Sequence, residues 1–288
     1  MKKVLVIGGN GFLGSILSEV LLNRNYDVTI ADLHNSRTSN KFIKCDISKD
    51  EDIDLIFNNH YDIVYNLAGI ANLDEAIENP IKTMELNFVS NIKIIQKCID
   101  NSVDKFVYAS SAYAMSEKGS FYGISKLASE KVIEEYNKKH NLNYIIIRYG
   151  SVYSERNFNN NYIYNLIKSA IEQKTINHAG DGEEIREYIH ANDAAELSVD
   201  VIENNDYLNK HIVLTGSQAI KRKDLFDMIN EVLGGDLIIK YDTKSNSNHY
   251  KLTPYSFQAS ISKKLTPNPQ IDLGQGILEC IRAVHENN

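Results

Sequence analysis

The stretch Val4–Ser15, VLVIGGNGFLGS, decides the fold of this chain. Its apolar run VLVI ends at two glycines, and an amphipathic helical pattern then covers Phe12–Leu22. A strand, a tight turn and a helix are therefore predicted around Gly8, Gly11 and Gly14. Glycine permits positive φ and a close approach to the backbone, and a helix N-terminus attracts anions. The stretch predicts a dinucleotide-binding βαβ unit with a pyrophosphate at its turn.

An acidic residue follows the second predicted strand. Val28–Ala31 is apolar, and Asp32 comes directly after it, eighteen positions beyond Gly14 (32 − 14). A carboxylate at this place can accept hydrogen bonds from the adenosine ribose and repel a 2′-phosphate. Asp32 thus favours NAD over NADP, while Arg37 nearby would suit the phosphate. An ordinary βαβ unit with a capped turn is the alternative to a dinucleotide site.

The composition limits the class of protein. A chain of 288 residues can bury a core in one or two domains, and a net charge of −7 provides no basic surface for nucleic acid or anionic membrane. No apolar run approaches the ~20 residues of a membrane span. Met1 leads straight into a strand, without a signal peptide. Cys45, Cys98 and Cys280 lack metal-ligand spacing. We expect a cytoplasmic protein with no metal site, no nucleic acid partner and no membrane partner.

Apolar strands alternate with helical patterns as far as Gly150. Pro80 is expected to divide the longest helical pattern into two pieces. This alternation predicts an α/β fold, with a Rossmann-like, doubly wound parallel sheet covered on both faces. After the first unit, the predicted strands are Phe42–Lys44, Asp62–Gly69, Val103–Ala109 and Asn143–Arg148, and the predicted helices are Glu51–Asn59, Leu73–Ile99 and Tyr122–His140.

Beyond Gly150 the elements become shorter and more irregular. We expect a smaller C-terminal α/β substrate-binding domain, a cap, formed by about 157–187 and 216–288. Residues 1–156 and about 188–215 would form the NAD-binding domain. A ligand is expected in the cleft between them, at the carboxyl ends of the strands. Within this half, helices are predicted over Tyr162–Glu172, Asn192 or Asp193 to Ile202, Lys223–Leu233 and Gly274–His285, and strands over Ile185–Ile189 and His211–Leu214.

The segment YGISK, residues 122–126, contains the second candidate site. Tyr122 and Lys126 are four residues apart and share one face of a helix. An ammonium beside a phenol favours the phenolate, so the tyrosine pKa falls from ~10 toward neutrality. Such a phenol can exchange a proton with a substrate hydroxyl or carbonyl while hydride moves to or from nicotinamide. Lys126 can also bind the nicotinamide ribose, and Ser111 can bond the same substrate oxygen. A surface Tyr–Lys pair is the alternative.

Together these motifs resemble an extended short-chain dehydrogenase/reductase of the NAD-dependent nucleotide-sugar epimerase/dehydratase group. The resemblance runs from Lys2 to about Leu214. It is carried by GGNGFLG, Asp32, Asp46-Ile47, NLAG (66–69), Asn87, YASSA (108–112), YGISK, IIIRYGSVY (145–153) and GDGEEIREYIHANDAA (180–195).

The resemblance implies a role for individual residues and a homodimer built through a helix bundle. Catalytic roles fall to Ser111, Tyr122 and Lys126, with Ser110 and Ser116 as alternatives for the serine. Substrate contacts fall to Asn87, Ser111, Ser151 and Arg186, the last to phosphates. Cofactor contacts fall to Gly8, Gly11, Phe12, Leu13, Gly14, Asp32, Asp46, Ile47, Leu67, Ala68, Tyr122, Lys126 and Tyr149.

For several of these residues a purely structural role is the alternative. Arg186 can instead pair with Glu184 or Glu187, and Asp46 can cap the following helix. Asn87 can hold a helix bend, and Tyr149 can belong to the core. His190, directly before a predicted helix, is expected to be structural.

Departures from the family pattern narrow the reaction. Ser111 and Tyr122 are only eleven residues apart (122 − 111), where extended members usually have a longer loop. Ala112 and Tyr113 stand where family dehydratases have an Asp-Glu pair, which disfavours 4,6-dehydration. We expect an NAD-dependent C4 epimerase of a nucleotide-activated sugar, working through a transient 4-keto intermediate. A nucleotide-sugar dehydrogenase or 4-keto reductase is the alternative, followed by a non-catalytic dinucleotide-binding relative.

Overall fold

One large sheet organises the molecule. The computed structural model describes residues 1–34, 41–158, 161–243, 263–268 and 270–287. Within them, the eight strands of this sheet are all parallel. They are β1 (Lys3–Ile7), β2 (Asp27–Asp32), β3 (Lys41–Lys44), β4 (Ile63–Asn66), β5 (Lys105–Ser111), β6 (Tyr144–Tyr149), β10 (Lys210–Leu214) and β13 (Lys263–Leu265), in the order β13-β10-β6-β5-β4-β1-β2-β3. The predicted doubly wound sheet is confirmed.

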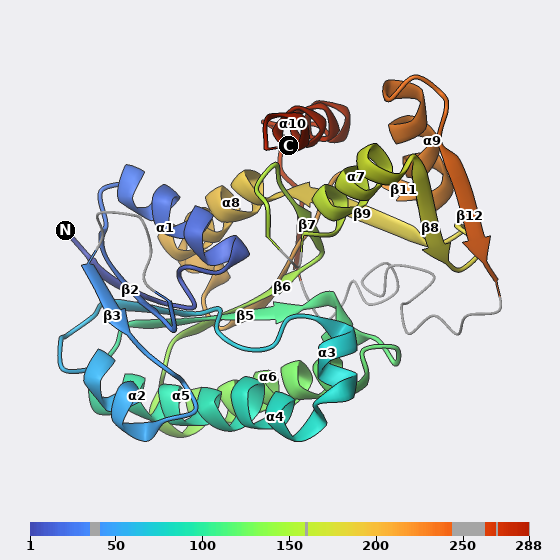
Figure 1. The fold of residues 1–288 in the computed structure, drawn as a ribbon. Helices are drawn as coiled ribbons and strands as arrows, with labels where there is room; N and C mark the ends of the chain where they lie inside the picture. The colour runs from blue at the N-terminus through green and yellow to red at the C-terminus, as the bar shows by residue number, and fades with distance from the viewer. Residues whose placement is uncertain (35–40, 159–160, 244–262, 269, 288) are drawn as a thin grey trace.

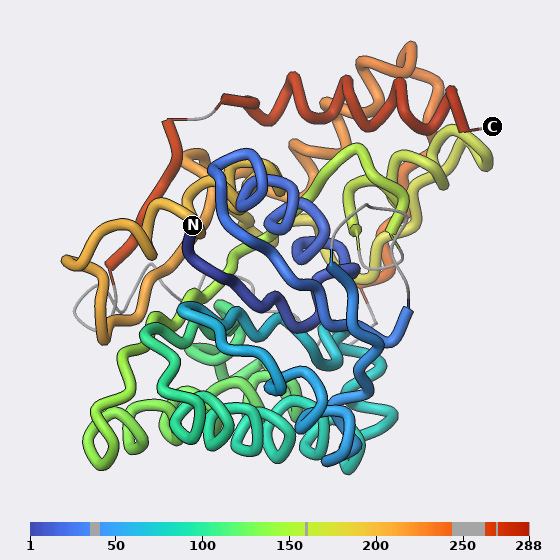
Figure 2. The backbone as a smooth tube through the Cα atoms, turned by 90° about the vertical axis from the view of Figure 1, so that its left-hand side faces the viewer, coloured from blue at the N-terminus to red at the C-terminus, as the bar shows by residue number. Residues whose placement is uncertain are grey.

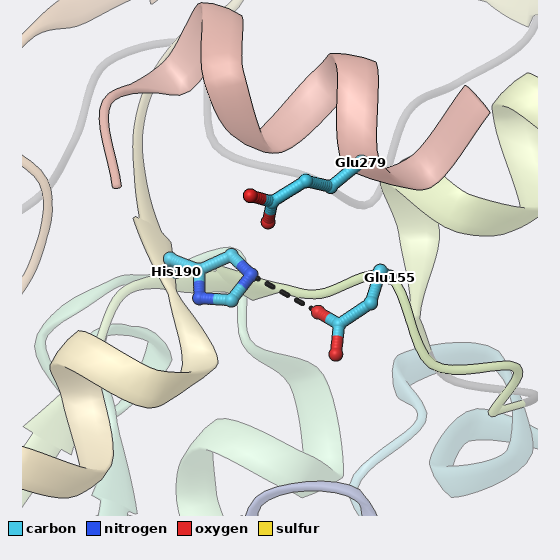
Figure 3. Close-up of side chains that lie close together, drawn as sticks. All are labelled: Glu155, His190 and Glu279. Atoms are coloured by element: carbon cyan, nitrogen blue, oxygen red, sulfur yellow. Dashed lines mark ion pairs between the residues drawn. The ribbon is translucent and has the colours of Figure 1, made fainter. Parts of the chain in front are cut away.

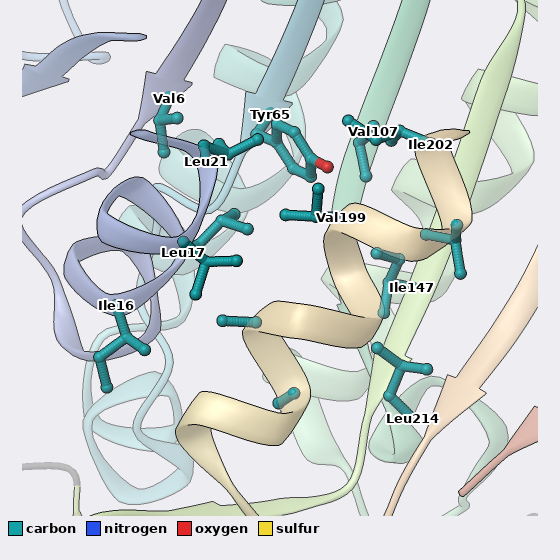
Figure 4. Close-up of a cluster of buried hydrophobic side chains, with 14 of the residues drawn as sticks. Val6, Ile16, Leu17, Leu21, Tyr65, Val107, Ile147, Val199, Ile202 and Leu214 are labelled. Atoms are coloured by element: carbon teal, nitrogen blue, oxygen red, sulfur yellow. The ribbon is translucent and has the colours of Figure 1, made fainter. Parts of the chain in front are cut away.

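Helices cover both faces of this sheet (Figure 1). One face carries α1 (Phe12–Asn23) and α8 (Ala191–Glu203), and the other carries α2 (Asp50–Ile56), α5 (Ser90–Asp100) and α6 (Ser120–His140). Figure 4 shows the core under α1 and α8, where aliphatic side chains from both helices meet those of the strands. Tyr65 is fully buried there, and its hydroxyl is satisfied because it donates to the Ser198 carbonyl at 2.8 Å. Strands buried on both faces explain the unbroken apolar runs of the sequence.

The long helical pattern after β4 is divided, as expected. It forms α3 (Leu73–Glu78) and α4 (Pro80–Met84), and Pro80 occupies the first turn of α4, where its missing N–H is not needed. A π-helical turn, η1 (Glu85–Val89), then leads into α5. Such a turn shifts the helix face by one residue and is frequent at functional sites.

The second half builds a smaller α/β region beside the sheet (Figures 1 and 2). Its strands form a three-stranded sheet, β11-β9-β7, and a parallel pair, β12-β8. Apolar residues of its three helices share one cluster. The elements are β7 (Ser151–Tyr153), α7 (Tyr162–Gln173), β8 (Thr175–Ala179), β9 (Ile185–His190), β11 (Ala219–Lys221), α9 (Arg222–Val232), β12 (Ile238–Asp242) and α10 (Leu273–Glu286). The 3-10 turn η3 (Asn205–Tyr207) belongs instead to the main sheet's side, where it connects α8 to β10.

The structure corrects two expectations about this half. Residues 216–288 do not all belong to the cap, because β13 pairs with β10 and extends the main sheet. Its sequence, KKL, has no apolar run that could have predicted a strand. Helix α8 is capped by His190 and not by Asn192 or Asp193: the His190 ring accepts the Asn192 N–H at 3.3 Å. The structural role expected for His190 is thereby confirmed.

Every helix in the described part of the chain is too short or too polar to cross a lipid bilayer.

Candidate functional site

The glycine turn after β1 has the geometry predicted for it. Gly8 has φ +79°, and its carbonyl accepts the Gly11 N–H at 3.1 Å. A Cβ on Gly14 would lie 2.1 Å from the Gly8 carbonyl oxygen, so only glycine fits at the start of α1. A Cβ on Gly8 would meet the Ala68 nitrogen at 2.7 Å. The turn, the first turn of α1 and the end of β4 therefore share a space too narrow for side chains, which suits a pyrophosphate.

A cavity of about 800 Å³ opens at this turn. Asp32 lies on its wall at the end of β2, and one Asp32 oxygen accepts the Asn10 N–H at 2.9 Å. Near Asp32, beyond the end of the neighbouring strand β3, Asp46 accepts from the backbone N–H and the hydroxyl of Ser48, and this bonding lowers the pKa of Asp46. The predicted cofactor residues that line the cavity are Gly8, Gly11, Asp32, Asp46, Ile47, Leu67 and Ala68.

The other predicted cofactor residues have different surroundings. Phe12, Leu13 and Gly14 form the first turn of α1, and the Phe12 ring packs against Phe158 with centroids 5.4 Å apart. Tyr149 is buried under α8, and its hydroxyl is 2.8 Å from the Ser198 hydroxyl. That bond assigns the Tyr149 hydroxyl to the core, which was the alternative to its predicted nicotinamide contact.

Ser111, Tyr122 and Lys126 come together where β5 ends and α6 begins. Ser111 is the last residue of β5, and its hydroxyl accepts the Tyr113 N–H at 3.3 Å. The Tyr113 ring packs edge-on against the Tyr122 ring, with centroids 6.1 Å apart. Tyr122 also shares an apolar cluster with Ile70, a residue of the cavity wall. Tyr122 is thus connected through Ile70 to the cavity of the glycine turn.

The short loop before Tyr122 folds back onto α6. The first four residues of this loop, Ala112–Met115, form a 3-10 turn, η2. A Cβ on Gly123 would lie 2.7 Å from the Tyr113 carbonyl oxygen, and one on Gly119 would lie 2.8 Å from it. Two glycines therefore allow η2 to lie directly against α6.

The structure distinguishes Ser111 from Ser110. The Ser110 hydroxyl donates to Glu130 at 2.5 Å in the interior, so it is used within the protein. Ser116 lies beyond η2, and its hydroxyl accepts the Lys118 N–H at 3.0 Å. Ser111, one residue beyond Ser110, is the serine at the strand end beside Tyr113.

Lys126 is held inside the fold. Its ammonium donates to the Ala109 carbonyl at 2.8 Å, and Nζ lies 5.9 Å from the centroid of the Tyr122 ring. Burial disfavours the charged form and lowers the pKa of Lys126 from 10.5 to about 8, although the Glu130 carboxylate opposes this shift. A lysine whose pKa lies near neutral pH, placed beside a phenol, is the arrangement expected for proton exchange.

Glu130 was not predicted as part of the site. It lies four residues beyond Lys126 on α6, and its carboxylate binds Arg148 of β6 through contacts of 2.9 and 2.6 Å. Burial acts to raise the pKa of Glu130, but hydrogen bonds from Arg148, His211 and Ser110 lower it to about 2. The spacing Tyr122, Lys126, Glu130 was the available signal, since residues four apart share a helix face.

Asn87, for which a substrate contact was expected, makes its side-chain hydrogen bonds within the protein. Its side chain accepts the Ile70 N–H at 2.7 Å and donates to the Ile70 carbonyl at 3.0 Å and the Ser125 hydroxyl at 3.1 Å. The residue is 1% exposed. Asn87 therefore connects η1, the loop after β4 and α6, and its amide is used within the protein.

Arg186 and Ser151 lie on neighbouring strands of the three-stranded sheet. Ser151 is half-buried on β7, in register with Tyr188. Arg186 is buried on β9 and donates to the Ile185 carbonyl at 2.7 Å. Of the two carboxylates that were the alternative partners of Arg186, Glu184 pairs with His178 and Glu187 with Lys264. Their substrate contacts stay predictions.

One cluster of potential metal ligands occurs in the described ranges: Glu155, His190 and Glu279 (Figure 3). His190 Nε2 faces Glu155 Oε2 at 3.2 Å. His190 Nδ1 accepts the Asn192 N–H, while Nε2 and the Glu155 Oε2 beside it are buried without a hydrogen-bond partner in the part of the chain that the structure describes.

The sequence profile of the NAD dependent epimerase/dehydratase family matches residues 4–215. The chain belongs to this family. It is therefore an NAD-dependent enzyme of the short-chain dehydrogenase/reductase superfamily. The glycine turn and Asp32 fit the cofactor, since the turn excludes side chains and Asp32 presents a carboxylate to the cavity.

Individual relatives in the family share nearly the whole chain or most of it. A putative UDP-glucose 4-epimerase from Methanocaldococcus jannaschii is 29% identical, over 99% of both chains. A UDP-N-acetyl-alpha-D-glucosaminuronate decarboxylase from Bacillus cytotoxicus is 27% identical over 76% of both. Among solved structures, the UDP-glucuronic acid 4-epimerase of Bacillus cereus, in complex with UDP-glucuronic acid and NAD, superposes with a TM-score of 0.86 at 23% identity, covering 99% of this chain and 100% of that one.

Proposed function

We propose that this family member is an epimerase acting on C4 of a nucleotide-activated sugar through a transient 4-keto intermediate. The observation that carries the proposal is the meeting of Ser111, Tyr122 and Lys126 beside the cofactor cavity. Relatives named as UDP-sugar 4-epimerases support the substrate class.

Each residue has a defined part in this reaction. Tyr122 accepts the proton of the C4 hydroxyl and returns it after the 4-keto sugar has presented its other face. Lys126 stabilises the phenolate by its charge, and Ser111 donates a hydrogen bond to the C4 oxygen. NAD supplies the acceptor and donor of the hydride. Gly8, Gly14 and Asp32 would hold it at the glycine turn.

The neighbourhood of Ser111 favours epimerisation over dehydration. Ala112 and Tyr113 follow it in η2, and neither can serve as the carboxyl acid or base that removes water from a sugar. Dehydrogenation and 4-keto reduction need the same three residues. They differ from epimerisation because the hydride does not return to the sugar within the same turnover.

The test measures bound cofactor and product together. The protein is purified without added cofactor and denatured, and the released dinucleotide is quantified; about one NAD per chain is expected. NMR then follows UDP-, dTDP-, GDP- and CDP-sugars for their C4 epimers, with Tyr122→Phe as the inactive control. Little bound dinucleotide together with net change at the NADH absorbance band would establish the dehydrogenase or reductase in its place.

We also propose a cytoplasmic homodimer. Apolar side chains are exposed along α4, η1 and α6, with Ile81 75% exposed and Ile124 56% exposed. Residues of this kind on one face mark an interaction surface. Ile124→Glu is expected to convert a dimer into a monomer in sedimentation velocity, whereas Lys131→Glu, on the same helix, is expected to leave it dimeric. The three cysteines are free thiols, which accords with a reducing compartment.

A further inference from the structure

Arg222, the first residue of α9, is a buried arginine whose guanidinium keeps two nitrogens without a hydrogen-bond partner among the described residues. Its side chain is 9% exposed, and its guanidinium stacks on the Tyr162 ring at 3.9 Å from the ring centroid. Nε and Nη1 are buried without a hydrogen-bond partner. A buried guanidinium in this condition is costly unless an anion completes it.

The acidic side chains around Arg222 are engaged elsewhere. Among the described residues, Glu183 pairs with Lys221 and Lys223, while Glu184 pairs with His178 and Glu187 with Lys264. The segments outside the described ranges, residues 35–40, 159–160, 244–262, 269 and 288, contain no aspartate or glutamate. In the described part of the chain, the Glu184 carboxylate acts on the Arg222 charge from a distance and its ion pair is with His178, so the two free guanidinium nitrogens are open to an anion from outside the chain.

Arg222 is connected to the candidate catalytic residues through a tyrosine. Burial acts to lower the pKa of Arg222, but Tyr188, Tyr162, Tyr113 and the Glu184 carboxylate are near enough to act on its charge, and they raise that pKa. Tyr113 connects Arg222 to the reaction centre, because the Tyr113 ring packs against Tyr122. The strand before Arg222 pairs with β9, where Ile220 lies opposite Arg186, and the Arg222 backbone N–H donates to the Glu184 carbonyl at 2.9 Å.

We propose that Arg222 binds an anionic group of the substrate, either a phosphoryl group of the diphosphate or a carboxylate on the sugar. The inference rests on the proposed function and assigns it a further binding residue. Both groups present charged oxygens to the free guanidinium nitrogens, and binding removes the cost of the buried charge. Stacking on Tyr162 fixes the plane of the guanidinium, so little ordering is needed on binding.

The experiment compares the affinity of Arg222→Met with that of the wild type and of Lys223→Met. The methionine keeps an aliphatic stem over Tyr162 but removes the charge. Lys223 is the matched control, since it is the next residue of α9 and its ammonium lies at the surface on Glu183. Calorimetry on the NAD-containing protein first identifies which of UDP, dTDP, GDP and CDP binds, and then uses the glucose and glucuronate conjugates of that nucleotide.

We expect Arg222→Met to bind about 10- to 100-fold more weakly and Lys223→Met to stay within about twofold. An equal loss for diphosphate, glucose conjugate and glucuronate conjugate identifies the phosphoryl group as the partner. A loss confined to the glucuronate conjugate identifies the carboxylate. Unchanged affinity of Arg222→Met for all ligands overturns the inference and leaves the proposed function standing. Failure of the wild type to bind any nucleotide refutes the proposed function itself.

Stability separates binding from packing. Without nucleotide, Arg222→Met is expected to melt close to the wild-type Tm, because the methionine keeps the packing on Tyr162 and removes a guanidinium with two unsatisfied nitrogens. A lower Tm with unchanged affinity would assign Arg222 to packing and overturn the inference. If the methionine variant does not fold, Arg222→Lys replaces it; it keeps the charge without the planar donors and is expected to bind about 10-fold more weakly.

Discussion

Glu130 Oε2 and Arg148 Nη2 lie 2.6 Å apart in the interior, with the Glu130 side chain fully buried and that of Arg148 4% exposed. This pair joins the catalytic helix α6 to the strand beside it. Because Glu130 follows Lys126 by one helical turn, the pair also sets how α6 presents Tyr122 and Lys126 to the end of β5.

Removing one partner of this pair is expected to be strongly destabilising. Glu130→Gln or Arg148→Met should lower the free energy of unfolding by about 3–5 kcal/mol, because each leaves an unpaired buried charge. The double variant Glu130→Leu/Arg148→Met should recover much of the loss. Urea unfolding measures all three. Lys131→Ala, which breaks a surface pair with Glu134, should change stability by less than about 1 kcal/mol. Single variants as stable as this control would contradict the interpretation.

Lys126 should make stability depend on pH. Its pKa is lowered to about 8 by burial, against 10.5 for an ordinary lysine. Between these values the unfolded chain holds a proton that the folded protein has released, so the free energy of unfolding rises with pH through this group. The full rise is about 3 kcal/mol. Wild type and Lys126→Met are compared by urea unfolding at pH 7 and pH 10. A stability difference that does not change with pH would refute the assignment.

Gly14→Ala should abolish tight NAD binding. The new Cβ would lie 2.1 Å from the Gly8 carbonyl oxygen, so the turn or the helix must move. We expect an affinity for NAD at least 10-fold weaker and a loss of about 1–3 kcal/mol in stability. Gly274→Ala, in the first turn of α10, adds the same methyl group with its nearest contact at 3.3 Å and should leave NAD affinity unchanged. Equal NAD content of the two variants would count against the turn as the pyrophosphate site.

Asn87→Ala should lower the stability of the protein and loosen the packing of the loop after β4 against α6. It removes the partners of the buried Ile70 N–H and carbonyl, at about 1–3 kcal/mol for each group left unsatisfied. Ser125→Ala removes only one of the Asn87 contacts and is expected to cost less. Thermal unfolding and kcat are measured for both. An Asn87→Ala variant with wild-type Tm and greatly reduced kcat would restore the substrate contact that the sequence suggested.

Local patterns accounted for the features that depend on neighbouring residues. The glycine turn, the alternating strands and helices and the shared face of Tyr122 and Lys126 all follow from spacings of a few residues. The strand β13 could not be predicted from local patterns, because the segment KKL becomes a strand only through pairing with β10. The role of Asn87 was equally hidden, since its partner Ile70 lies seventeen residues away.

The sequence by itself determined the doubly wound sheet, the dinucleotide turn and the Tyr–Lys pair, because glycine conformation, apolar runs and helix periodicity act within short segments. Only the tertiary structure decided that Glu130 neutralises Arg148, that Ser110 donates to Glu130 while Ser111 stands at the strand end, and that two guanidinium nitrogens of Arg222 are buried without a hydrogen-bond partner in the described ranges. These outcomes depend on which distant side chains share a low-dielectric interior, where an ion needs a partner, and spacing along the chain does not specify that.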